Sequence, residues 1–258
     1  MRGDQGFPVR LRFAKHGKVR FISHRDVARA FERTFRIAQL PLAFTQGFSP
    51  RPKVSFGLAL SVGHESDAEY LDVELAEPVD LAPLAGALSD GLPEGIDVTG
   101  TAALAERAPA LQEAITAVVY RVELPGTDPA ALDQAVTELL ARDTVTMTVV
   151  RKGRETVEDV RPAFRCVEVV PADRLPDGAT GGPALDLELA TRPRNIRPGE
   201  ALAALRDVAP GAGELEEHRV VRTHQWIERD GARLEPLDAD LRSSAPSGAS
   251  TRALEACA

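Results

Sequence analysis

A run of arginines followed by a short basic loop forms the part of the chain whose side chains could bind a polyanion. Arginines recur between residues 25 and 36 at spacings of four, four and three, which places them on one face of a helix. The loop at residues 47–53 adds two further cations and an aromatic ring. Guanidinium groups bind phosphate through paired N–H donors, and aromatic rings stack on bases. The predicted nucleic-acid-binding residues of this stretch are Arg20, Arg25, Arg29, Arg33, Arg36, Phe48, Ser49, Arg51 and Lys53.

A solvated helix face and a buried aromatic cluster would explain the same pattern without any ligand. Exposed helix faces are commonly charged, and phenylalanine is most often a core residue. For Phe48 taken alone a buried position is the favoured interpretation, although Phe44 and Phe48 could also stack on bases. For the arginines and the loop taken together, a binding surface is favoured.

A second basic loop lies much later in the chain, between Pro193 and Pro198. It contains Arg194 and Arg197 and leads into a predicted helix, whose N-terminal N–H groups could bind an anion. An ordinary helix-entry loop accounts for the same residues equally well. Arg194 and Arg197 therefore join the predicted nucleic-acid-binding set as contributions from the second half of the chain.

His24 and Asp26 are weak candidates for catalysis, and no catalytic residue is assigned. A histidine oriented by a carboxylate is the simplest form of general base. A histidine that hydrogen-bonds a neighbouring loop is the commoner arrangement and is favoured here. Ser23, which precedes this pair, is interpreted as a helix N-cap rather than as a nucleophile.

Neither the histidines nor the cysteines show the spacing of a metal site, so no metal and no cofactor are expected in this chain. Cys166 and Cys257 lie far apart, which matches neither a disulfide-rich framework nor paired CxxC motifs and favours a reducing compartment. No apolar stretch has the length of a signal peptide or a membrane span. A soluble, cytoplasmic protein without membrane contact is therefore expected.

The formal net charge of −8 conceals two parts of opposite sign. Residues 1–60 hold 12 Lys and Arg against 3 Asp and Glu, whereas the remaining residues hold 19 against 36. A basic segment on an acidic body is typical of a protein that offers one face to a polyanion. The alternative is a general acidic bias with a few arginines gathered by chance.

Hydrophobic periodicity predicts a β-α-β-β-α-β order for the first hundred residues. This order predicts a ferredoxin-like unit, with helices on one face of an antiparallel sheet and the other face open. Glu69 is expected to form a structural ion pair with Arg10 or Arg12 of the adjacent strand, which is a commoner outcome than a catalytic carboxylate. The predicted elements are strands at 9–14, 53–62, 68–76 and 96–103, a helix between Ser23 and Pro41, and a helix at 81–92.

The second half repeats this order with an additional hairpin, which predicts a second ferredoxin-like unit. The predicted fold class is therefore α+β, with tandem units at residues 1–104 and 113–237 and a disordered tail at 238–258. The predicted elements of this half are strands at 115–124, 145–150, 155–160, 164–170, 185–190 and 215–227 and helices at 128–140 and 198–208.

A dense series of motifs runs from Arg12 to Leu75. It comprises Phe21-Ile22-Ser23-His24, Asp26, Arg33, Pro41-Leu42, Gly47-Phe48, Pro50, Pro52-Lys53, Ser55-Phe56, Gly63 and Glu69-Tyr70-Leu71-Asp72. This series resembles the radical-SAM-associated family whose domain of unknown function is numbered 2344, and later segments resemble its actinobacterial, stand-alone branch more loosely. Two residues depart from the family pattern, since Arg51 replaces an expected histidine and Arg25 an expected apolar residue.

The resemblance implies an accessory protein that works beside a radical SAM enzyme, because the family's members resemble the C-terminal part of radical SAM proteins or occur as separate chains beside them. This chain has no CxxxCxxC motif, so any iron–sulfur cluster and S-adenosylmethionine would belong to the partner. We therefore expect a non-catalytic module that binds tRNA or rRNA, or presents a substrate, for a radical SAM protein. The alternatives are a protein-interaction subunit that binds no RNA and an RNA-processing enzyme that uses His24.

Overall fold

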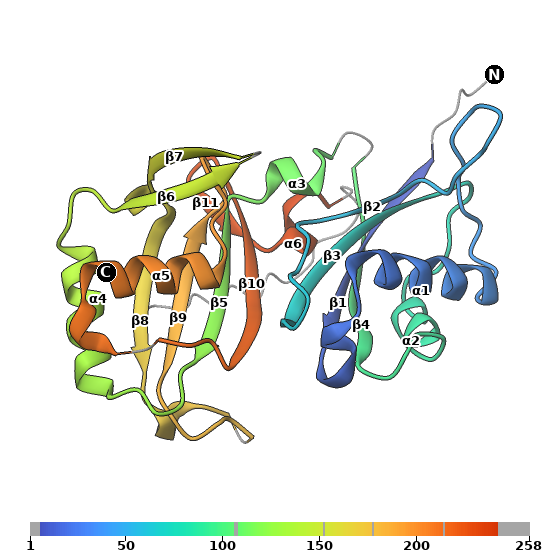
Figure 1. Cartoon of the computed structure of the whole chain (residues 1–258). Helices are drawn as coiled ribbons and strands as arrows, with labels where there is room; N and C mark the ends of the chain where they lie inside the picture. The colour runs from blue at the N-terminus through green and yellow to red at the C-terminus, as the bar shows by residue number, and fades with distance from the viewer. Residues whose placement is uncertain (1–5, 106–107, 152, 177, 214, 242–258) are drawn as a thin grey trace.

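The two halves of the chain contribute strands to one large, mostly antiparallel sheet, and helices pack on it (Figure 1). The structure, a computed structural model, describes residues 6–105, 108–151, 153–176, 178–213 and 215–241. The architecture is of the α+β class, as expected. None of the helices in these ranges is long and apolar enough to cross a membrane.

The N-terminal half forms one end of the sheet. In it, β4 lies beside β1, β1 lies beside β3, and the short β2 pairs with the other edge of β3, all antiparallel. The elements of this half are β1 (Phe7–Lys15), the 3-10 turn η1 (Gly17–Phe21), α1 (His24–Ile37), β2 (Val54–Phe56), β3 (Glu65–Leu75), α2 (Leu84–Ser89) and β4 (Ile96–Ala103).

The C-terminal half forms the other end of the sheet and follows the short helix α3 (Leu111–Ala114). Its elements are β5 (Ala117–Glu123), α4 (Pro129–Leu140), β6 (Thr146–Arg151), β7 (Arg154–Asp159), β8 (Phe164–Val170), β9 (Ala184–Ala190), α5 (Pro198–Val208), β10 (Arg219–Arg229), β11 (Ala232–Leu234) and α6 (Pro236–Ala239), with 3-10 turns η2 (Arg161–Ala163), η3 (Ala172–Arg174) and η4 (Pro210–Ala212). Four strands lie in the order β10-β5-β9-β8, whereas β6 and β7 form a separate hairpin (Figure 1).

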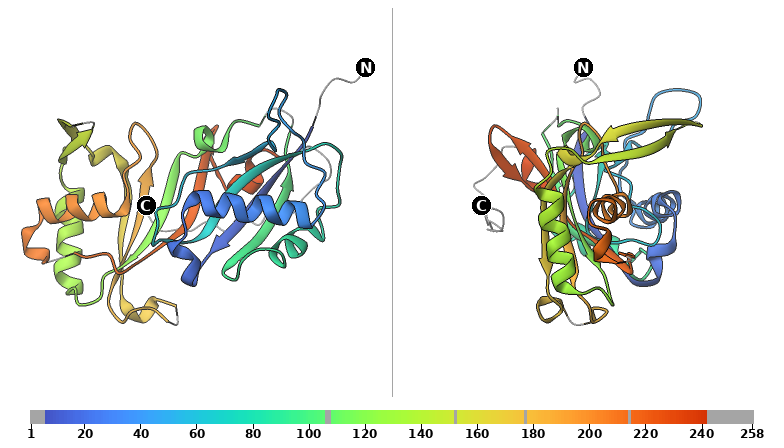
Figure 2. Two further views of the ribbon diagram at one scale, coloured as in Figure 1. Left: turned by 45° about the vertical axis from the view of Figure 1, so that its right-hand side comes forward. Right: turned by 60° about the vertical axis from the view of Figure 1, so that its left-hand side comes forward.

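The same strand order occurs in both halves. In the N-terminal half, the fourth strand lies beside the first, the first beside the third, and the third beside the second. When the β6–β7 hairpin is set aside, β5, β8, β9 and β10 follow the same order. α1, α2, α4 and α5 cover one face of the sheet, and β11 and α6 lie on the other (Figure 2). Each half therefore shows the β-α-β-β-α-β succession that the sequence predicts.

The two halves meet in the middle of the sheet, where β3 and β10 run parallel. Their register pairs Glu65 with Val221 and Ser66 with Arg222, so the nine strands form one sheet rather than two. β2 pairs with residues 71–73 of β3, whereas residues 65–66, at the start of the same edge, pair with β10. One edge of β3 therefore pairs with strands of both halves.

The strand predicted at 53–62 ends already at Phe56. Residues 57–60 leave the sheet and pass over Arg222, which is almost fully buried. The carbonyl oxygens of Leu58 and Ala59 accept hydrogen bonds from its guanidinium at 2.8 and 3.1 Å. A buried guanidinium needs such acceptors, and strand pairing would have used these carbonyls elsewhere.

α1 is fixed by its cap and by an apolar stripe that faces the sheet. The Ser23 hydroxyl accepts a hydrogen bond from the Asp26 amide at 3.3 Å, which confirms the predicted N-cap. The ring of Phe31 is fully buried and meets Phe13 of β1 edge to face, with ring centroids 4.8 Å apart. Deleting such a ring costs about 3–5 kcal/mol of stability. The opposite face of α1 is left to solvent.

The far face of the N-terminal half is covered by the C-terminal segment, contrary to the open face that the sequence predicts. Arg10 of β1 is fully buried there, and its guanidinium donates to both oxygens of Asp72 at 2.7 and 2.8 Å and to the Pro236 carbonyl at 2.9 Å. Leu241 forms a bridge with Leu104. Residues 238–241 therefore belong to the fold, and the rest of the predicted tail, 242–258, lies outside the described residues.

Candidate nucleic-acid interface

The outward face of α1 carries the four predicted arginines, which we call the α1 basic face: Arg25, Arg29, Arg33 and Arg36. All four side chains are exposed. Arg29 lies 3.3 Å from Asp26 in an exposed pair, which contributes little stability and leaves both groups hydrated. Arg36 donates only to the Glu32 carbonyl, at 3.4 Å. Within the described ranges, neither Arg25 nor Arg33 has an acidic partner.

The basic loop of residues 44–52 projects beyond the C-terminal end of α1, on the helix-covered side of the sheet (Figures 1 and 2). Its base is closed by a bridge between Phe44 and Pro52 and by hydrogen bonds between Thr45 and Arg51 at 2.9 and 3.1 Å. Gly47 adopts a φ of 130°, a conformation that residues with a side chain rarely adopt. The backbone thus builds a narrow projection with its tip in solvent.

Phe48 lies at the tip of this projection and is 111% exposed, so the favoured interpretation of a buried ring is wrong. Phe44 is 51% exposed. Ser49 and Arg51 are exposed as well. The loop therefore presents an aromatic ring, a hydroxyl and a guanidinium to solvent.

Lys53 and Arg20 differ from the other predicted cations because acidic groups neutralise them. Lys53 lies 2.9 Å from the Glu74 carboxylate, and Arg20 lies 3.2 Å from Glu65 and over the ring of Phe21. Arg20 therefore faces the junction between the two halves rather than the α1 basic face.

The second basic loop, before α5, lies in the other half of the sheet from α1 (Figure 1). Arg194 is mostly buried and pairs with Glu158 at 3.1 Å and with Glu200. The charge of Arg194 is therefore neutralised by carboxylates of the same half of the chain. Arg197 is exposed at the N-cap of α5, and its backbone N–H donates to Glu200 at 2.9 Å. The two predicted basic surfaces do not merge into one.

The weak catalytic candidates His24 and Asp26 do not form a dyad. Asp26 instead accepts from the Ser23 hydroxyl at 2.6 Å, and this hydrogen bond lowers the pKa of its carboxyl. The His24 ring packs edge to face on Phe56, with centroids 5.0 Å apart. With no carboxylate to orient it among the described residues, His24 lacks the partner of a general base.

A small cavity of about 20 Å³ lies between His24, Lys15 and Glu69, with room for about one water molecule. Burial lowers the pKa of Lys15, whose ammonium donates to the carbonyls of Arg20 and Ile22. The cavity is too small for a substrate.

Glu69 pairs with neither of the arginines proposed for it. Its carboxylate lies 2.8 Å from Arg222 of β10, because Glu69 points to the helix-covered face and Arg10 and Arg12 to the other. Arg12 pairs with Glu235 at 3.3 Å. The expected ion pair exists, but its partner comes from the other half of the chain.

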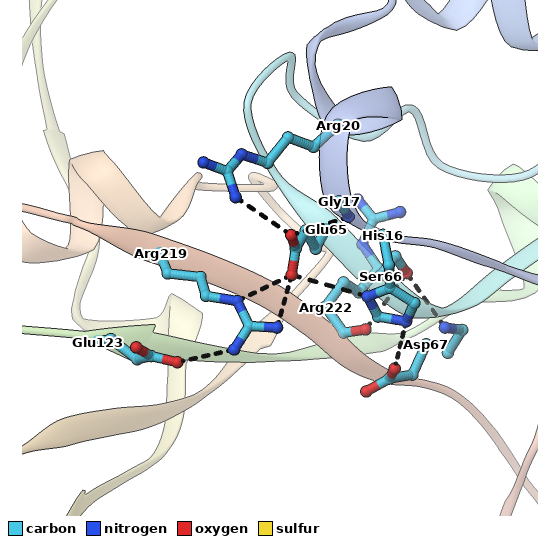
Figure 3. Close-up of polar contacts among 10 residues, drawn as sticks. His16, Gly17, Arg20, Glu65, Ser66, Asp67, Glu123, Arg219 and Arg222 are labelled. Atoms are coloured by element: carbon cyan, nitrogen blue, oxygen red, sulfur yellow. Dashed lines mark hydrogen bonds and ion pairs between the residues drawn. The ribbon is translucent and has the colours of Figure 1, made fainter. Parts of the chain in front are cut away.

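A polar cluster at the junction of the halves contains residues that the sequence did not single out (Figure 3). Glu65 is its centre: the carboxylate accepts from the Gly17 backbone at 3.1 Å, from Arg20 at 3.2 Å and from Arg219 at 2.8 Å. Arg219 also donates to Glu123 at 3.1 Å. Because these residues lie on four separate elements, no spacing in the sequence could have identified the cluster.

His16 extends this cluster toward β3. Its Nε2 lies 2.9 Å from Asp67, and its Nδ1 lies 3.7 Å from Glu65. The hydrogen bond with Asp67 raises the pKa of His16 despite partial burial. Among the described residues, no group of three or more His, Cys, Asp or Glu side chains is arranged to hold a metal ion.

Comparisons with known proteins place the chain in a family but not in an activity. No curated protein matches it. A chain in a crystal structure of a Cbf5–Nop10–Gar1 complex is similar at 12% identity and a TM-score of 0.41, over 86% of this chain and 49% of that one. This chain spans about half the length of that neighbour, and so slight a likeness bears on neither fold nor function. A family profile matches residues 9–198, most of the chain, which therefore belongs to the uncharacterized proteins conserved in bacteria that are grouped as DUF2344.

Proposed function

We propose that this protein binds RNA through the α1 basic face and the tip of the 44–52 loop, and that it does so as an accessory protein of a radical SAM partner. The observation that carries the proposal is the exposure of four arginines next to a loop whose phenylalanine is entirely in solvent. Arginines bind successive phosphates, and a free ring can stack on an unpaired base.

The dimensions of the surface suit a nucleic-acid strand. Arg25 and Arg36 lie eleven residues apart on α1, a distance of about 16 Å at 1.5 Å of rise per residue, which spans several phosphates. Two acidic residues, Asp26 and Glu32, share the exposed side of the helix, and only Asp26 pairs with an arginine. The surface is therefore basic overall.

Further parts of the proposal rest on family resemblance and on the order of elements. The radical SAM partner, the choice of tRNA or rRNA and a cytoplasmic location follow from the resemblance of the motifs between Arg12 and Leu75. Two ferredoxin-like units, at residues 1–104 and 113–237, are proposed because both halves share one strand order. Any iron–sulfur cluster and S-adenosylmethionine belong to the partner in this proposal.

A titration of total tRNA and of rRNA fragments against the full chain at increasing salt tests the proposal. Binding should weaken steeply with salt, and Arg29→Glu with Arg33→Glu should abolish it, because phosphate contacts release counterions. Arg33→Glu is compared with Arg174→Glu, which reverses one exposed arginine on η3 and should leave binding unchanged. A flat salt response, or equal effects of the two single variants, would remove the proposal.

Phe48→Ala separates stacking from charge. Loss of one stacked ring should weaken binding by roughly 1–3 kcal/mol while the salt dependence keeps its slope. A variant that binds RNA as tightly as the wild type would show that the exposed ring has another purpose.

A docking surface for the radical SAM protein is the second candidate, favoured by the exposed Phe44, Ile37 and Phe48 beside arginines. Aromatic residues and arginine are enriched in protein interfaces. Co-purification of the partner after nuclease treatment, lost in Phe48→Ala, would support docking over RNA binding. RNA processing by His24 is not carried further, since no carboxylate orients the ring.

A further inference from the structure

A groove of about 470 Å³ opens at the junction of the two halves, away from the α1 basic face. One wall is η1 with the end of β1, the other is the turn around Gly178 and Thr180, and the start of β10 lies between them. The residues that line it are His16, Gly17, Arg20, Glu65, Gly178, Thr180, His218 and Arg219. Figure 3 shows several of their side chains converging on Glu65.

The charged side chains of this groove differ in how deeply they are buried. The carboxylates of Glu65 and Glu123 are 4% and 2% exposed, whereas the guanidiniums of Arg20 and Arg219 belong to side chains 36% and 29% exposed. The carboxylates therefore hold the two arginines in place and balance their charge, while the exposed parts of both guanidiniums face the groove. Such backing fixes the orientation of a guanidinium before any ligand arrives.

The two arginines retain unused donors. A guanidinium has five N–H groups. Arg20 spends one on Glu65, and Arg219 spends three on Glu65 and Glu123. His218 is exposed in the same groove and bonds no other side chain among the described residues. Three side chains from two elements thus offer donors to a common space.

We propose that this groove binds a phosphate monoester, the phosphate of a nucleotide or of an RNA end. A phosphate monoester carries close to two negative charges and three acceptor oxygens, which matches the donors of Arg20, Arg219 and His218. A carboxylate offers two oxygens and one charge and would leave part of this set unused.

The site is independent of the proposed RNA-binding surface. Its residues come from η1, β3, the turn before β9 and the start of β10, and none of them is an arginine of α1. A chain that failed to bind tRNA could still bind a phosphate here, so the two proposals fail separately.

Calorimetric titration of the full chain with inorganic phosphate and with adenosine 5′-monophosphate, followed by amide chemical shifts, tests the site. We expect both to bind and to shift the amides of Gly17, Gly178 and Arg219. Arg20→Gln and His218→Gln should each weaken binding about tenfold, since a hydrogen bond to a charged group contributes about 1.5–3 kcal/mol. Arg192→Gln, which removes an exposed arginine just after β9 that belongs to neither proposed site, should change nothing.

Unmoved amide signals at those three positions would overturn the proposal, as would equal phosphate binding by Arg20→Gln and wild type in a chain with unchanged thermal unfolding. Dinucleotides with and without a 5′-phosphate identify the source of the phosphate. Preference for the phosphorylated form supports recognition of an RNA end. Binding of adenosine 5′-monophosphate without either dinucleotide supports a free nucleotide.

Discussion

Single ionised side chains contribute, together with apolar ones, where distant parts of this chain meet. Arg222 is the clearest case, because it is 2% exposed and its guanidinium contacts Glu69, Tyr120 and two carbonyls at 2.8–3.1 Å. Removal of one member of a buried pair leaves the other charge without compensation, which is more costly than the pair itself is favourable.

Arg222→Ala is therefore expected to lower the free energy of unfolding by about 3–5 kcal/mol. The matched control is Arg29→Ala, which breaks an exposed pair and should cost at most about 1 kcal/mol. Urea unfolding of both variants measures the difference. Equal losses would mean that the buried pair contributes no more than a surface contact.

His16 gives the stability a defined dependence on pH. Its folded pKa is raised above the unfolded value of about 6.5, so its contribution is fully present below that pH and is lost as pH rises through the folded pKa. The groups that face it are Asp67 and Glu65. The stability difference between wild type and His16→Gln should be largest below about pH 6.5 and shrink as the pH rises above that value. A difference that grew with pH would contradict this assignment.

At the scale of the element, the position of α1 depends both on a local sequence signal and on a tertiary contact. The cap starts the helix and the buried stripe holds it on the sheet, which leaves the third side free for arginines. The positions of the arginines in the α1 basic face therefore depend on how firmly α1 is held on the sheet.

Ser23→Ala should destabilise the protein by about 1 kcal/mol, because the Asp26 amide loses the hydroxyl acceptor and the Asp26 carboxylate loses the hydroxyl donor. Thr at position 23 can supply the same hydroxyl, so Ser23→Thr should restore most of the loss. Ser49→Ala, on the exposed loop, is the control and should be neutral. Thermal unfolding measures all three, and a neutral Ser23→Ala would show that the cap is dispensable.

Elements with strong local signals were predictable from the sequence. The cap at Ser23, the strand at 96–103 and the helix at 198–208 lie where periodicity places them. The predicted strand after Lys53 was wrong beyond Phe56, because the carbonyls of the following residues accept hydrogen bonds from a guanidinium far away in the sequence. Local pattern carries no information about such a partner.

The candidate surfaces, too, could be predicted only where a local sequence pattern determines them. The arginines of α1 could be placed by helical spacing alone, since a 3.6-residue period fixes which side chains share a face. Phe48 could not, because its exposure depends on a projection closed by Phe44 and Pro52. The groove around Glu65 could not be foreseen at all, since it exists only once β3 and β10 are paired.

At the scale of the whole molecule, two cores are joined by little backbone pairing. Only two residue pairs link β3 and β10. One side chain, Arg219, bonds Glu65 of the N-terminal half and Glu123 of the C-terminal half at 2.8 and 3.1 Å. Ion pairing thus adds to the joint where strand pairing is short.

Arg219→Met should loosen this joint without unfolding either half. Hydrogen exchange is expected to become faster at residues 65–66 and 221–222, while β1 and β4 keep their protection. The control is Arg121→Met, whose guanidinium bonds Asp186 within the C-terminal half only. Exchange rates at the joint that do not differ between the two variants would show that Arg219 is not a link.

α6 covers the far face of β1, and the ribosome synthesises α6 long after β1. Arg10 leaves the ribosome 226 residues before Pro236, the carbonyl to which it donates. β1, β3 and β4 are available once residue 103 has been made, yet the Arg10 guanidinium lacks the Pro236 carbonyl until residue 236 has been made and until then can bond Asp72. A chain that stops before residue 235 would therefore expose Arg10 and Arg12 on a sheet face that residues 235–241 cover in the structure.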